Sequence, residues 1–396
     1  MHALSNPPSD TMRTEHLSNA ELLHYSRQMT LPEVGREGQL ALKNARVLLV
    51  GAGGLGSPLA LYLAAAGVGT LGVVEYDDIE ASNLHRQVLY GAEQIGKPKL
   101  DAAVARLQSL NPHIQVVPHP FRLTSENAMD VIARYDLVAD GTDNFSARYL
   151  VNDACVLNGK LNVHASIYRF DGMVSIFGAA TGPCYRCIYP EPPPPGLVPS
   201  CAEAGVLGVL PGIVGALQAN EVIKLLLGIG DPLIGRLLQF DALTMQFREF
   251  AIQKDAACPI CSSAPSIKAL VDYAAFCGLH AEEAPHGDSI TVAQLNEKLG
   301  AGAALSLIDV RNRAEYDAIR IDGARLLPLD ELLASPPPLD GDNLIVCYCQ
   351  SGVRSAKAAR ALQQFGFPHV ASLEGGILAW LKSGTQAGAQ RPNSSE

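Results

Sequence analysis

The feature that most constrains the fold is a short apolar run that leads directly into a cluster of glycines. Residues 45–50 read Ala-Arg-Val-Leu-Leu-Val, and Gly51, Gly53, Gly54 and Gly56 follow in the pattern G-x-G-x-x-G. Residues 55–66 then have the composition of a helix. A strand, a glycine turn and a helix in this order favour a phosphate-binding loop, because glycine lets the backbone approach phosphate and the helix N-terminus favours negative charge. The pattern alone also fits a tight turn in an α/β protein that binds no nucleotide.

Further short apolar runs alternate with helical segments along the chain. They cover residues 70–74, 136–139 and 174–177 in the first part, and 305–310, 344–349 and the region near Val370 in the second part, where residues 356–364 read as a helix. Strands that alternate with helices predict a largely parallel α/β sheet. We expect a Rossmann-like first domain, whose sheet is mixed, followed by a smaller α/β domain.

The length and the apolar content allow two domains. The chain has 396 residues, of which 48% are apolar, and a chain of this length is too long for one ordinary core. The apolar periodicity lapses around residues 281–288, which marks a linker. We therefore expect a flexible arm over residues 1–20, a first domain over 21–280, the linker over 281–288, a second domain over 289–385 and a disordered tail over 386–396.

Charge and hydropathy exclude several classes of protein. The net charge of −10 argues against nucleic-acid binding, because that function needs clustered Lys and Arg. Residues 1–20 do not read as a secretory signal. The longest charge-free stretch, residues 205–220, is interrupted by Pro211 and is followed by Glu221 and Lys224, which favours a buried helix over a membrane span. We predict a cytoplasmic protein with no membrane partner.

Polar side chains gather after the second predicted strand. Glu75 ends that strand about 20 residues after the glycines, where an acidic residue binds ribose hydroxyls. The charged and amide residues Asp77, Asp78, Asn83, Arg86, Gln87, Lys97 and Lys99 follow. A dinucleotide pyrophosphate would not need them, whereas a triphosphate needs fixed cations and a metal ion held by carboxylate. Asp143 lies beyond the end of another strand, where such sites form.

Four motifs in register carry a resemblance to a known family. They are Gly-Ala-Gly-Gly-Leu-Gly at 51–56, Ser-Asn-Leu-His-Arg-Gln at 82–87, Gly-Lys-Pro-Lys at 96–99 and Gly-Thr-Asp-Asn at 141–144. In this order they resemble the MoeB/ThiF family, relatives of ubiquitin-activating enzymes, over residues 25–278. The resemblance implies an ATP-dependent adenylyltransferase that acts on a small ubiquitin-like sulfur-carrier protein ending in Gly-Gly.

The same resemblance assigns roles to individual residues. Glu75, where the family usually has Asp, would hold the ribose, and Asn83, Arg86, Gln87 and Lys99 would hold the phosphates. Asp143 would organise Mg²⁺. Arg27 would reach into the ATP site of the partner subunit, which implies a homodimer.

Two C-x-x-C pairs predict a zinc site. Cys184 and Cys187 form the first pair, and Cys258 and Cys261 form the second. Four thiolates in tetrahedral geometry are what a structural Zn²⁺ requires, and the family resemblance agrees. A redox dithiol is the alternative, but it would need a thioredoxin-like context that neither pair has.

Cys201 is the candidate catalytic thiol of the first domain. It follows the proline-rich residues 190–199, which read as an extended loop. A lone cysteine is more often a buried apolar residue, and we assign only that role to Cys155 and Cys277. For Cys201, the family's cysteine at the matching place implies thioester or persulfide chemistry.

The second domain resembles a rhodanese. The resemblance rests on Ile-Asp-Val-Arg at 308–311, Glu-Tyr at 315–316, Ile-Asp-Gly-Ala at 321–324, Cys-Gln-Ser-Gly-Val-Arg-Ser at 349–355 and Glu-Gly-Gly at 374–376. Cys349 ends a strand and begins a loop before a helix. Backbone N–H groups and the helix N-terminus there would stabilise a thiolate or persulfide. Cys347 shares the same strand face and is predicted to pack in the core rather than act as a second thiol.

Together the two resemblances imply a complete reaction. ATP would activate the carrier's C-terminal glycine, and sulfur from a persulfide or thiosulfate donor would pass through Cys349 to give a carrier thiocarboxylate. The alternatives are a nicotinamide dehydrogenase, for which we find no hydride-transfer site, and a scaffold that binds a ubiquitin-like protein without catalysis. The pathway, whether molybdopterin, thiamine, cysteine, thiolated tRNA or siderophore synthesis, stays open.

Overall fold

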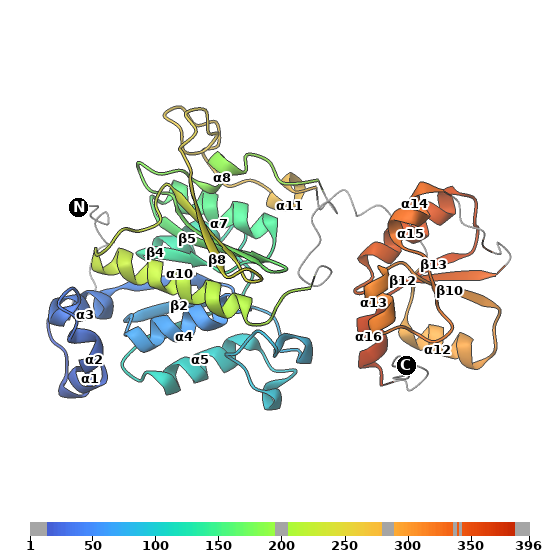
Figure 1. Cartoon of the computed structure of the whole chain (residues 1–396), viewed down its shortest axis with the longest axis horizontal. Coiled ribbons are helices and arrows are strands. Elements are labelled where there is room, and N and C mark those ends of the chain that lie inside the picture. The colour runs from blue at the N-terminus through green and yellow to red at the C-terminus, as the bar shows by residue number, and fades with distance from the viewer. Residues whose placement is uncertain (1–13, 195–204, 279–288, 336–338, 340–342, 385–396) are drawn as a thin grey trace. The chain divides into compact units, whose positions relative to one another are not determined.

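The computed structural model describes residues 14–194, 205–278, 289–335, 339 and 343–384. The chain forms two compact units, Met1–His280 and Ala281–Glu396 (Figure 1). The predicted linker, residues 281–288, lies outside the described residues, as do residues 1–13 of the predicted arm and the tail from 386. The end of the predicted arm is ordered, because Ser18 caps a helix that begins at Asn19.

The first unit is built on an eight-stranded sheet in the order β3-β2-β1-β4-β5-β6-β7-β8. Its strands are β1 (Arg46–Val50), β2 (Thr70–Val74), β3 (Gln115–His119), β4 (Leu137–Asp140), β5 (Leu161–Tyr168), β6 (Asp171–Phe177), β7 (Arg236–Asp241) and β8 (Gln246–Ala251). The strands from β3 to β5 are parallel, and β6, β7 and β8 continue the sheet antiparallel. The predicted mixed α/β sheet is confirmed.

Helices cover both faces of this sheet and link its parallel strands. They are α1 (Asn19–His24), α2 (Ser26–Met29), α3 (Gly35–Asn44), α4 (Gly56–Ala66), α5 (Lys99–Leu110), α6 (Ala128–Ala133), α7 (Phe145–Leu157), α8 (Tyr185–Ile188), α10 (Leu210–Leu227) and α11 (Tyr273–Phe276), with short 3-10 turns at Ala81–Asn83 and Ala92–Gln94. Helix α4 begins directly after the glycine turn, as the sequence predicts.

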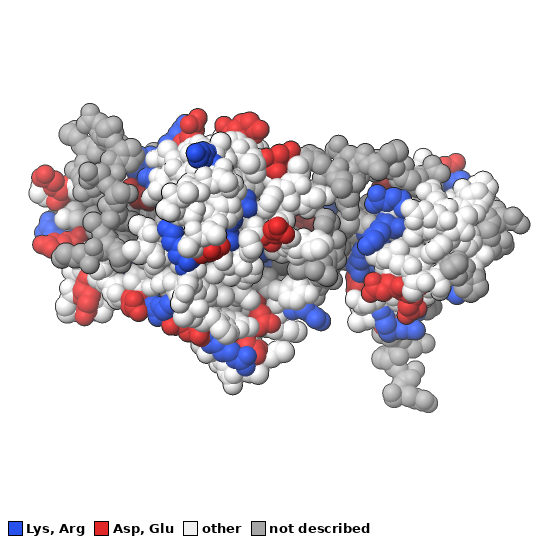
Figure 2. Space-filling view, turned by 90° about the horizontal axis from the view of Figure 1, so that it is seen from above, with Lys and Arg blue, Asp and Glu red and all other residues white. Residues whose placement is uncertain are grey.

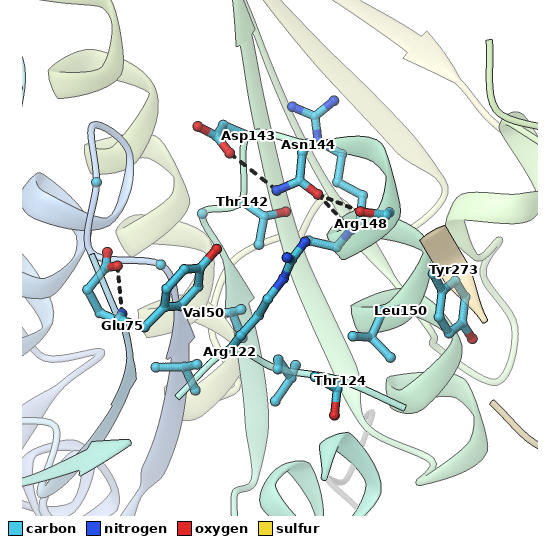
Figure 3. A pocket seen from close by; sticks show the side chains of 18 of the residues that line it. Val50, Glu75, Arg122, Thr124, Thr142, Asp143, Asn144, Arg148, Leu150 and Tyr273 are labelled. Carbon is cyan, nitrogen blue, oxygen red and sulfur yellow. Dashed lines mark hydrogen bonds between the residues drawn. The ribbon is translucent and has the colours of Figure 1, made fainter. Parts of the chain in front are cut away.

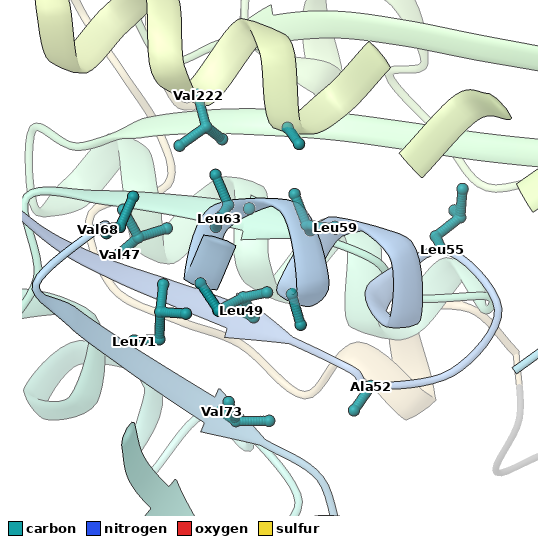
Figure 4. Packing of buried hydrophobic residues seen from close by; sticks show 14 of the residues in the cluster. Val47, Leu49, Ala52, Leu55, Leu59, Leu63, Val68, Leu71, Val73 and Val222 are labelled. Atoms are coloured by element: carbon teal, nitrogen blue, oxygen red, sulfur yellow. The ribbon is translucent and has the colours of Figure 1, made fainter. Parts of the chain in front are cut away.

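Alternation along β1 feeds two separate cores. Val47 and Leu49 pack under α4 and α10 in one apolar cluster (Figure 4), whereas Leu48 and Val50 join the cluster around α6 and α7 on the opposite face. Successive side chains of a strand point to opposite faces, so a strand buried on both sides must be apolar throughout. This is why the continuous run at 46–50 becomes a central strand.

Helix α10 is the long apolar helix of the first unit. Within the described residues, α10 is the one helix that is long and apolar enough to span a membrane, judged by length and composition alone. Core helices of soluble proteins also pass this test. Here Val214 and Val222 belong to the core that α10 shares with α4. Figure 4 shows Val222 on the side of α10 that faces α4. Pro211 does not interrupt the helix, because it stands in the first turn, where no intrahelical donor is needed.

The second unit has a five-stranded parallel sheet in the order β11-β10-β12-β13-β9. Its elements are β9 (Ser289–Ile290), α12 (Val292–Gly300), β10 (Leu305–Asp309), α13 (Arg313–Ala318), β11 (Arg325–Leu326), α14 (Leu329–Ala334), β12 (Leu344–Tyr348), α15 (Val353–Gln364), β13 (Val370–Leu373) and α16 (Gly376–Lys382). The predicted second α/β fold is confirmed. Helix α15 begins three residues before the predicted start at 356, because Gly352 turns the chain with φ +102°.

Candidate functional site

A pocket of about 630 Å³ opens at the carboxyl ends of the parallel strands in the first unit. The glycine turn, the residues that follow β2, β3 and β4, and the start of α7 line it. Eight of the residues predicted to bind nucleotide or Mg²⁺ are among its lining: Gly51, Gly53, Gly54, Glu75, Arg86, Gln87, Lys99 and Asp143. Parallel α/β sheets bind ligands at this edge.

The glycines of the turn serve two purposes. Gly51 has φ +90°, which is strained for any other residue, and a Cβ at Gly56 would collide with the carbonyl oxygen of Gly51. These two therefore close the turn upon itself. A Cβ at Gly53 would meet only the side-chain amide of Gln87, at 3.6 Å, so the backbone of Gly53 faces the open pocket. This is the geometry that phosphate needs in order to approach backbone N–H groups.

Glu75 is buried and ties the glycine turn to the end of β2. Its Oε2 accepts a hydrogen bond from the N–H of Ala52 at 3.0 Å, and its Oε1 accepts from the N–H groups of Tyr76 and Asp77 at 2.9 and 3.0 Å. With two lone pairs on each carboxylate oxygen, Oε1 is fully used and Oε2 retains one lone pair for another donor. The side chain of Glu75 thus spans from the end of β2 to the glycine turn while it lines the pocket.

Three further predicted residues form one wall of the pocket. Lys99, at the first position of α5, is buried, and its Nζ lies 3.1 Å from Asp77. Arg86 donates from Nη1 to the carbonyl oxygen of Ser82 at 3.0 Å. Gln87 is buried, and its Oε1 has no partner. A buried amide without a partner is costly, so this side chain fits a wall that a polar ligand covers.

Asp143 and Asn144 stand on a loop that buried groups hold in place. The carboxylate of Asp140, at the end of β4, accepts from the N–H and the hydroxyl of Thr142 at 2.9 and 2.7 Å, and it lies 2.9 Å from Nδ1 of His164. Asn144 caps α7 by accepting from the N–H of Ala147. Asp143 itself is exposed to the pocket, where a carboxylate suits Mg²⁺.

Two arginines of the pocket were missed from the sequence. Arg122 extends across the pocket, with Glu75 on one side and Leu150 and Tyr273 on the other, and Arg148 rises from α7 near Asn144 (Figure 3). With Arg86 and Lys99 they place four cationic side chains around one cavity, which suits a polyanion such as a triphosphate. Their positions after β3 and inside α7 were the available signal, but neither belongs to a glycine or lysine motif.

Three predicted binding residues do not line this pocket: Gly56, which closes the glycine turn, Asn83 and Arg27. Asn83 lies beside it, where its carbonyl oxygen accepts from the N–H groups of Arg86 and Gln87. Arg27 is exposed on α2, away from the pocket lining of its own chain.

The four predicted metal-ligating cysteines converge. Their sulfur atoms all lie within 4.8 Å of one another, and neighbouring pairs are 3.4, 3.6 and 3.9 Å apart. Tetrahedral Zn²⁺ with Zn–S bonds of about 2.3 Å needs sulfur atoms about 3.8 Å apart. Burial, and then the neighbouring cysteines, raises the pKa of Cys184, which is the cost of crowding four thiols without a cation. The donor set and spacing fit one Zn²⁺.

Arg186, between the cysteines of the first pair, anchors this cluster to α7. It is buried and makes a two-point salt bridge with Asp153 of α7, with its Nε 2.9 Å from Oδ1 and its Nη2 2.8 Å from Oδ2. The hydroxyl of Tyr273 donates to the same carboxylate at 2.8 Å. The cysteine cluster and the helix that begins at Asn144 therefore form one connected structure.

In the second unit, Cys349 follows β12 and is 1% exposed. The N–H of Gly352 donates to its Sγ at 3.1 Å, and the hydroxyl of Ser355 lies 3.6 Å from it, both at the start of α15. Such donors at a helix N-terminus stabilise a thiolate. Cys347 is fully buried in the core, and burial, then Cys349, raises its pKa to about 12.

The remaining cysteines divide clearly. Cys155 and Cys277 are buried in the apolar cluster around α7, in keeping with a packing role. Cys201 lies outside the described residues, so its role rests on the sequence alone.

Comparison with known proteins identifies both units. The ThiF family matches residues 25–260, and the rhodanese-like domain matches residues 291–383. The chain belongs to the ThiF family.

Two relatives match this ThiF-family chain over both of its units, and a third matches about two thirds of it. It is 49% identical to a probable adenylyltransferase/sulfurtransferase MoeZ of Mycobacterium tuberculosis, over 92% of this chain and 94% of that protein. It is 42% identical to the adenylyltransferase and sulfurtransferase MOCS3 of Drosophila grimshawi, over 94% and 87% of the two chains. A sulfur carrier protein adenylyltransferase of Thermus thermophilus is 58% identical over 65% of this chain and 97% of its own length. The chain is thus an enzyme, an adenylyltransferase joined to a sulfurtransferase.

A solved structure agrees on the fold of the first unit. The crystal structure of Escherichia coli MccB with a MccA variant superposes with a TM-score of 0.55 at 22% identity, over 62% of this chain and 76% of that one.

Proposed function

We propose that this enzyme uses ATP to adenylate the C-terminal glycine of a small ubiquitin-like sulfur-carrier protein ending in Gly-Gly, and then converts that glycine to a thiocarboxylate. One observation carries the proposal: the same chain holds a cationic pocket at the glycine turn and a second site in which Cys349 sits among thiolate-stabilising donors. The Thermus relative is named for its action on a sulfur carrier.

The pocket supplies the groups for the first step. An oxygen of the carrier carboxylate attacks the α-phosphorus of ATP, and the bond to the β-phosphate oxygen breaks, so that pyrophosphate leaves with the electron pair. Gly53, Arg86 and Lys99 would hold the phosphates, and Glu75 the ribose. Asp143 would hold Mg²⁺, which neutralises charge that develops on the phosphates.

Cys349 supplies the second step. Its persulfide attacks the acyl carbon of the adenylate, AMP leaves, and the carrier is joined to Cys349 through an acyl disulfide. A second thiol, which we assign to Cys201, then attacks Cys349 and releases the thiocarboxylate. The Cys201–Cys349 disulfide that remains is reduced by an external thiol. In the alternative order, Cys201 first holds the carrier as a thioester.

The rest of the proposal concerns assembly. Cys184, Cys187, Cys258 and Cys261 would bind one structural Zn²⁺. Arg27 would complete the ATP site of a partner subunit in a homodimer. We place the enzyme in the cytoplasm, since the eight described cysteines are free thiols and the predicted thiol chemistry needs reduced cysteines.

Substitutions of Cys349 and Cys201 should block the reaction at different steps. We expect Cys349→Ala to abolish thiocarboxylate formation and to leave carrier-dependent ATP–pyrophosphate exchange unchanged, because Cys349 takes no part in nucleotide binding. Cys201→Ala should also spare exchange but stall release of the thiocarboxylate. Mass spectrometry of the carrier after incubation with ATP and a sulfur donor measures both.

The control is Cys347→Ala, which removes a buried thiol two residues from Cys349 and should leave both activities in place. Normal thiocarboxylate formation by Cys349→Ala would refute the proposed sulfur route. If the wild-type enzyme shows no carrier-dependent ATP–pyrophosphate exchange, the proposed adenylation is refuted.

A further inference from the structure

A two-point salt bridge holds the arginine of the Cys349 loop. Arg354 stands five positions after Cys349, in the first turn of α15, and its Nη1 and Nη2 lie 2.9 and 2.7 Å from the two carboxylate oxygens of Glu315 on α13. Both side chains are largely buried, at 20% and 17% exposure. A pair of this geometry is strong and has little freedom to reorient. The guanidinium that is nearest to Cys349 in sequence is therefore directed toward a protein carboxylate.

The second arginine at this loop is held in the same way. Arg311 is buried, and its Nε and Nη2 donate to the carboxylate of Asp309 at 2.9 and 2.6 Å, while Nη2 also donates to the carbonyl oxygen of Ile319. Its Nη1 lies 3.4 Å from Oε1 of Gln350, which steadies the loop. Each of these two cations thus has a carboxylate counter-ion. Lys357, one turn further along α15, is exposed, where water and salt screen its charge.

This charge balance bears on the sulfur donor. Thiosulfate is a dianion, and its binding next to a thiolate needs a cation that is free to bind it. A persulfide carries its outer sulfur on an ordinary thiol and needs hydrogen-bond donors at the attacked sulfur more than a cation. The described surroundings of Cys349 offer the N–H of Gly352 and the hydroxyl of Ser355, together with the two neutralised arginines.

We propose that Glu315 is a specificity-determining residue of the sulfurtransferase unit: by holding Arg354, it directs Cys349 toward the outer sulfur of a thiol-bound persulfide and away from thiosulfate. The proposal rests on sulfur transfer through Cys349 as proposed above. In the step, the Cys349 thiolate attacks the outer sulfur and a new S–S bond forms. The bond to the donor's inner sulfur breaks, and that sulfur leaves with the electron pair and takes the proton as a thiol. No oxidant or reductant is needed.

The test is Glu315→Gln in the full chain. Glutamine keeps the cap of α13, in which the N–H of Asn312 donates to the side-chain oxygen of residue 315 at 3.1 Å, but it removes the counter-charge of Arg354. We expect the KM for thiosulfate to fall on the order of tenfold, because Glu315 no longer neutralises the charge of Arg354. The kcat/KM for cysteine persulfide should stay within about twofold. Raising the ionic strength should reduce the gain, since it is electrostatic.

Two further variants separate this role from a structural one. Asp317→Asn makes the same charge change on the same helix, in an exposed pair with Arg313 at 3.8 Å, and should not alter the KM for thiosulfate. Adding Arg354→Gln to Glu315→Gln should cancel the gain, because the guanidinium of Arg354 is the group that attracts the dianion in the single variant.

The outcomes distinguish the two proposals. A wild-type enzyme that uses thiosulfate as efficiently as cysteine persulfide, or a folded Glu315→Gln variant with an unchanged KM for thiosulfate, overturns the role of Glu315 and leaves sulfur transfer through Cys349 standing. If neither donor loads Cys349 of the wild-type enzyme with sulfur, the proposed function fails as well.

Discussion

The side chain of Glu75 both organises the glycine turn and lines the pocket. Its carboxylate holds three backbone N–H groups, one of them in the glycine turn, and so joins two segments 23 residues apart. Asp140 acts similarly under the Asp143 loop, where it gathers Thr142 and His164. Neither arrangement could be predicted from the sequence, because both depend on side chains that only the sheet brings together.

Asp143 is the residue whose loss should silence adenylation. We expect Asp143→Ala to lower carrier-dependent ATP–pyrophosphate exchange about a hundredfold or more, since the metal would lose its carboxylate in a site built around phosphate charge. Melting temperature and zinc content should not change, because Asp143 is exposed and, within the described part of the chain, its side chain makes one 3.4 Å contact, with Asn144.

The matched control is Asp130→Ala, an exposed carboxylate in the first turn of α6 and outside the pocket lining, which should exchange at the wild-type rate. Wild-type exchange by a folded Asp143→Ala variant would remove Asp143 from the proposed site.

At the scale of elements, α7 links the pocket to the cysteine cluster. Its first turn follows Asp143 and Asn144, and its middle carries Asp153, which holds Arg186. The guanidinium of Arg186 also lies 4.5 Å from the ring of Phe276 in α11, just before the end of the first unit. A metal at the four cysteines would therefore stabilise the contacts of α8 with α7 and α11, which lie far apart in sequence.

We predict one tightly bound zinc per chain. A closed tetrahedral site that joins two distant segments contributes directly to folding, so chelation should lower the melting temperature. Metal analysis and thermal unfolding measure this. Cys184→Ser should lose the zinc, whereas Cys277→Ser should retain it, because Cys277 packs in the cluster around α7. Freshly purified, folded protein without zinc would contradict the prediction.

At the scale of the whole molecule, Arg27 raises the question of assembly. It is exposed on α2 and does not line the pocket of its own chain, which is what a residue that acts in a partner's site requires. On the face of the first unit that Figure 2 shows, basic and acidic side chains are interspersed.

A mixing experiment tests the homodimer. Arg27→Ala and Asp143→Ala should each lack pyrophosphate exchange alone. Unfolded together and refolded, they should recover part of the activity, because one site of each mixed dimer would combine an intact Asp143 with the partner's intact Arg27. Recovery should follow the fraction of mixed dimer, measured with differently tagged chains. Activity of Arg27→Ala alone, or no recovery in confirmed mixed dimers, would exclude this role.

The sequence by itself determined what depends on local pattern. Apolar runs that end in glycine or acidic residues marked the strands, and the two C-x-x-C pairs and the Cys349 loop marked sites whose chemistry needs particular residues at short spacing. Tertiary structure decided what depends on distant segments meeting. It decided which strands, β6, β7 and β8, continue the sheet antiparallel, how Arg122 and Arg148 enter the pocket, and that Arg354 pairs with Glu315, 39 residues away. The three-dimensional path of the chain decides which carboxylate a cation meets, so the local spacing of residues in the sequence cannot predict the pair.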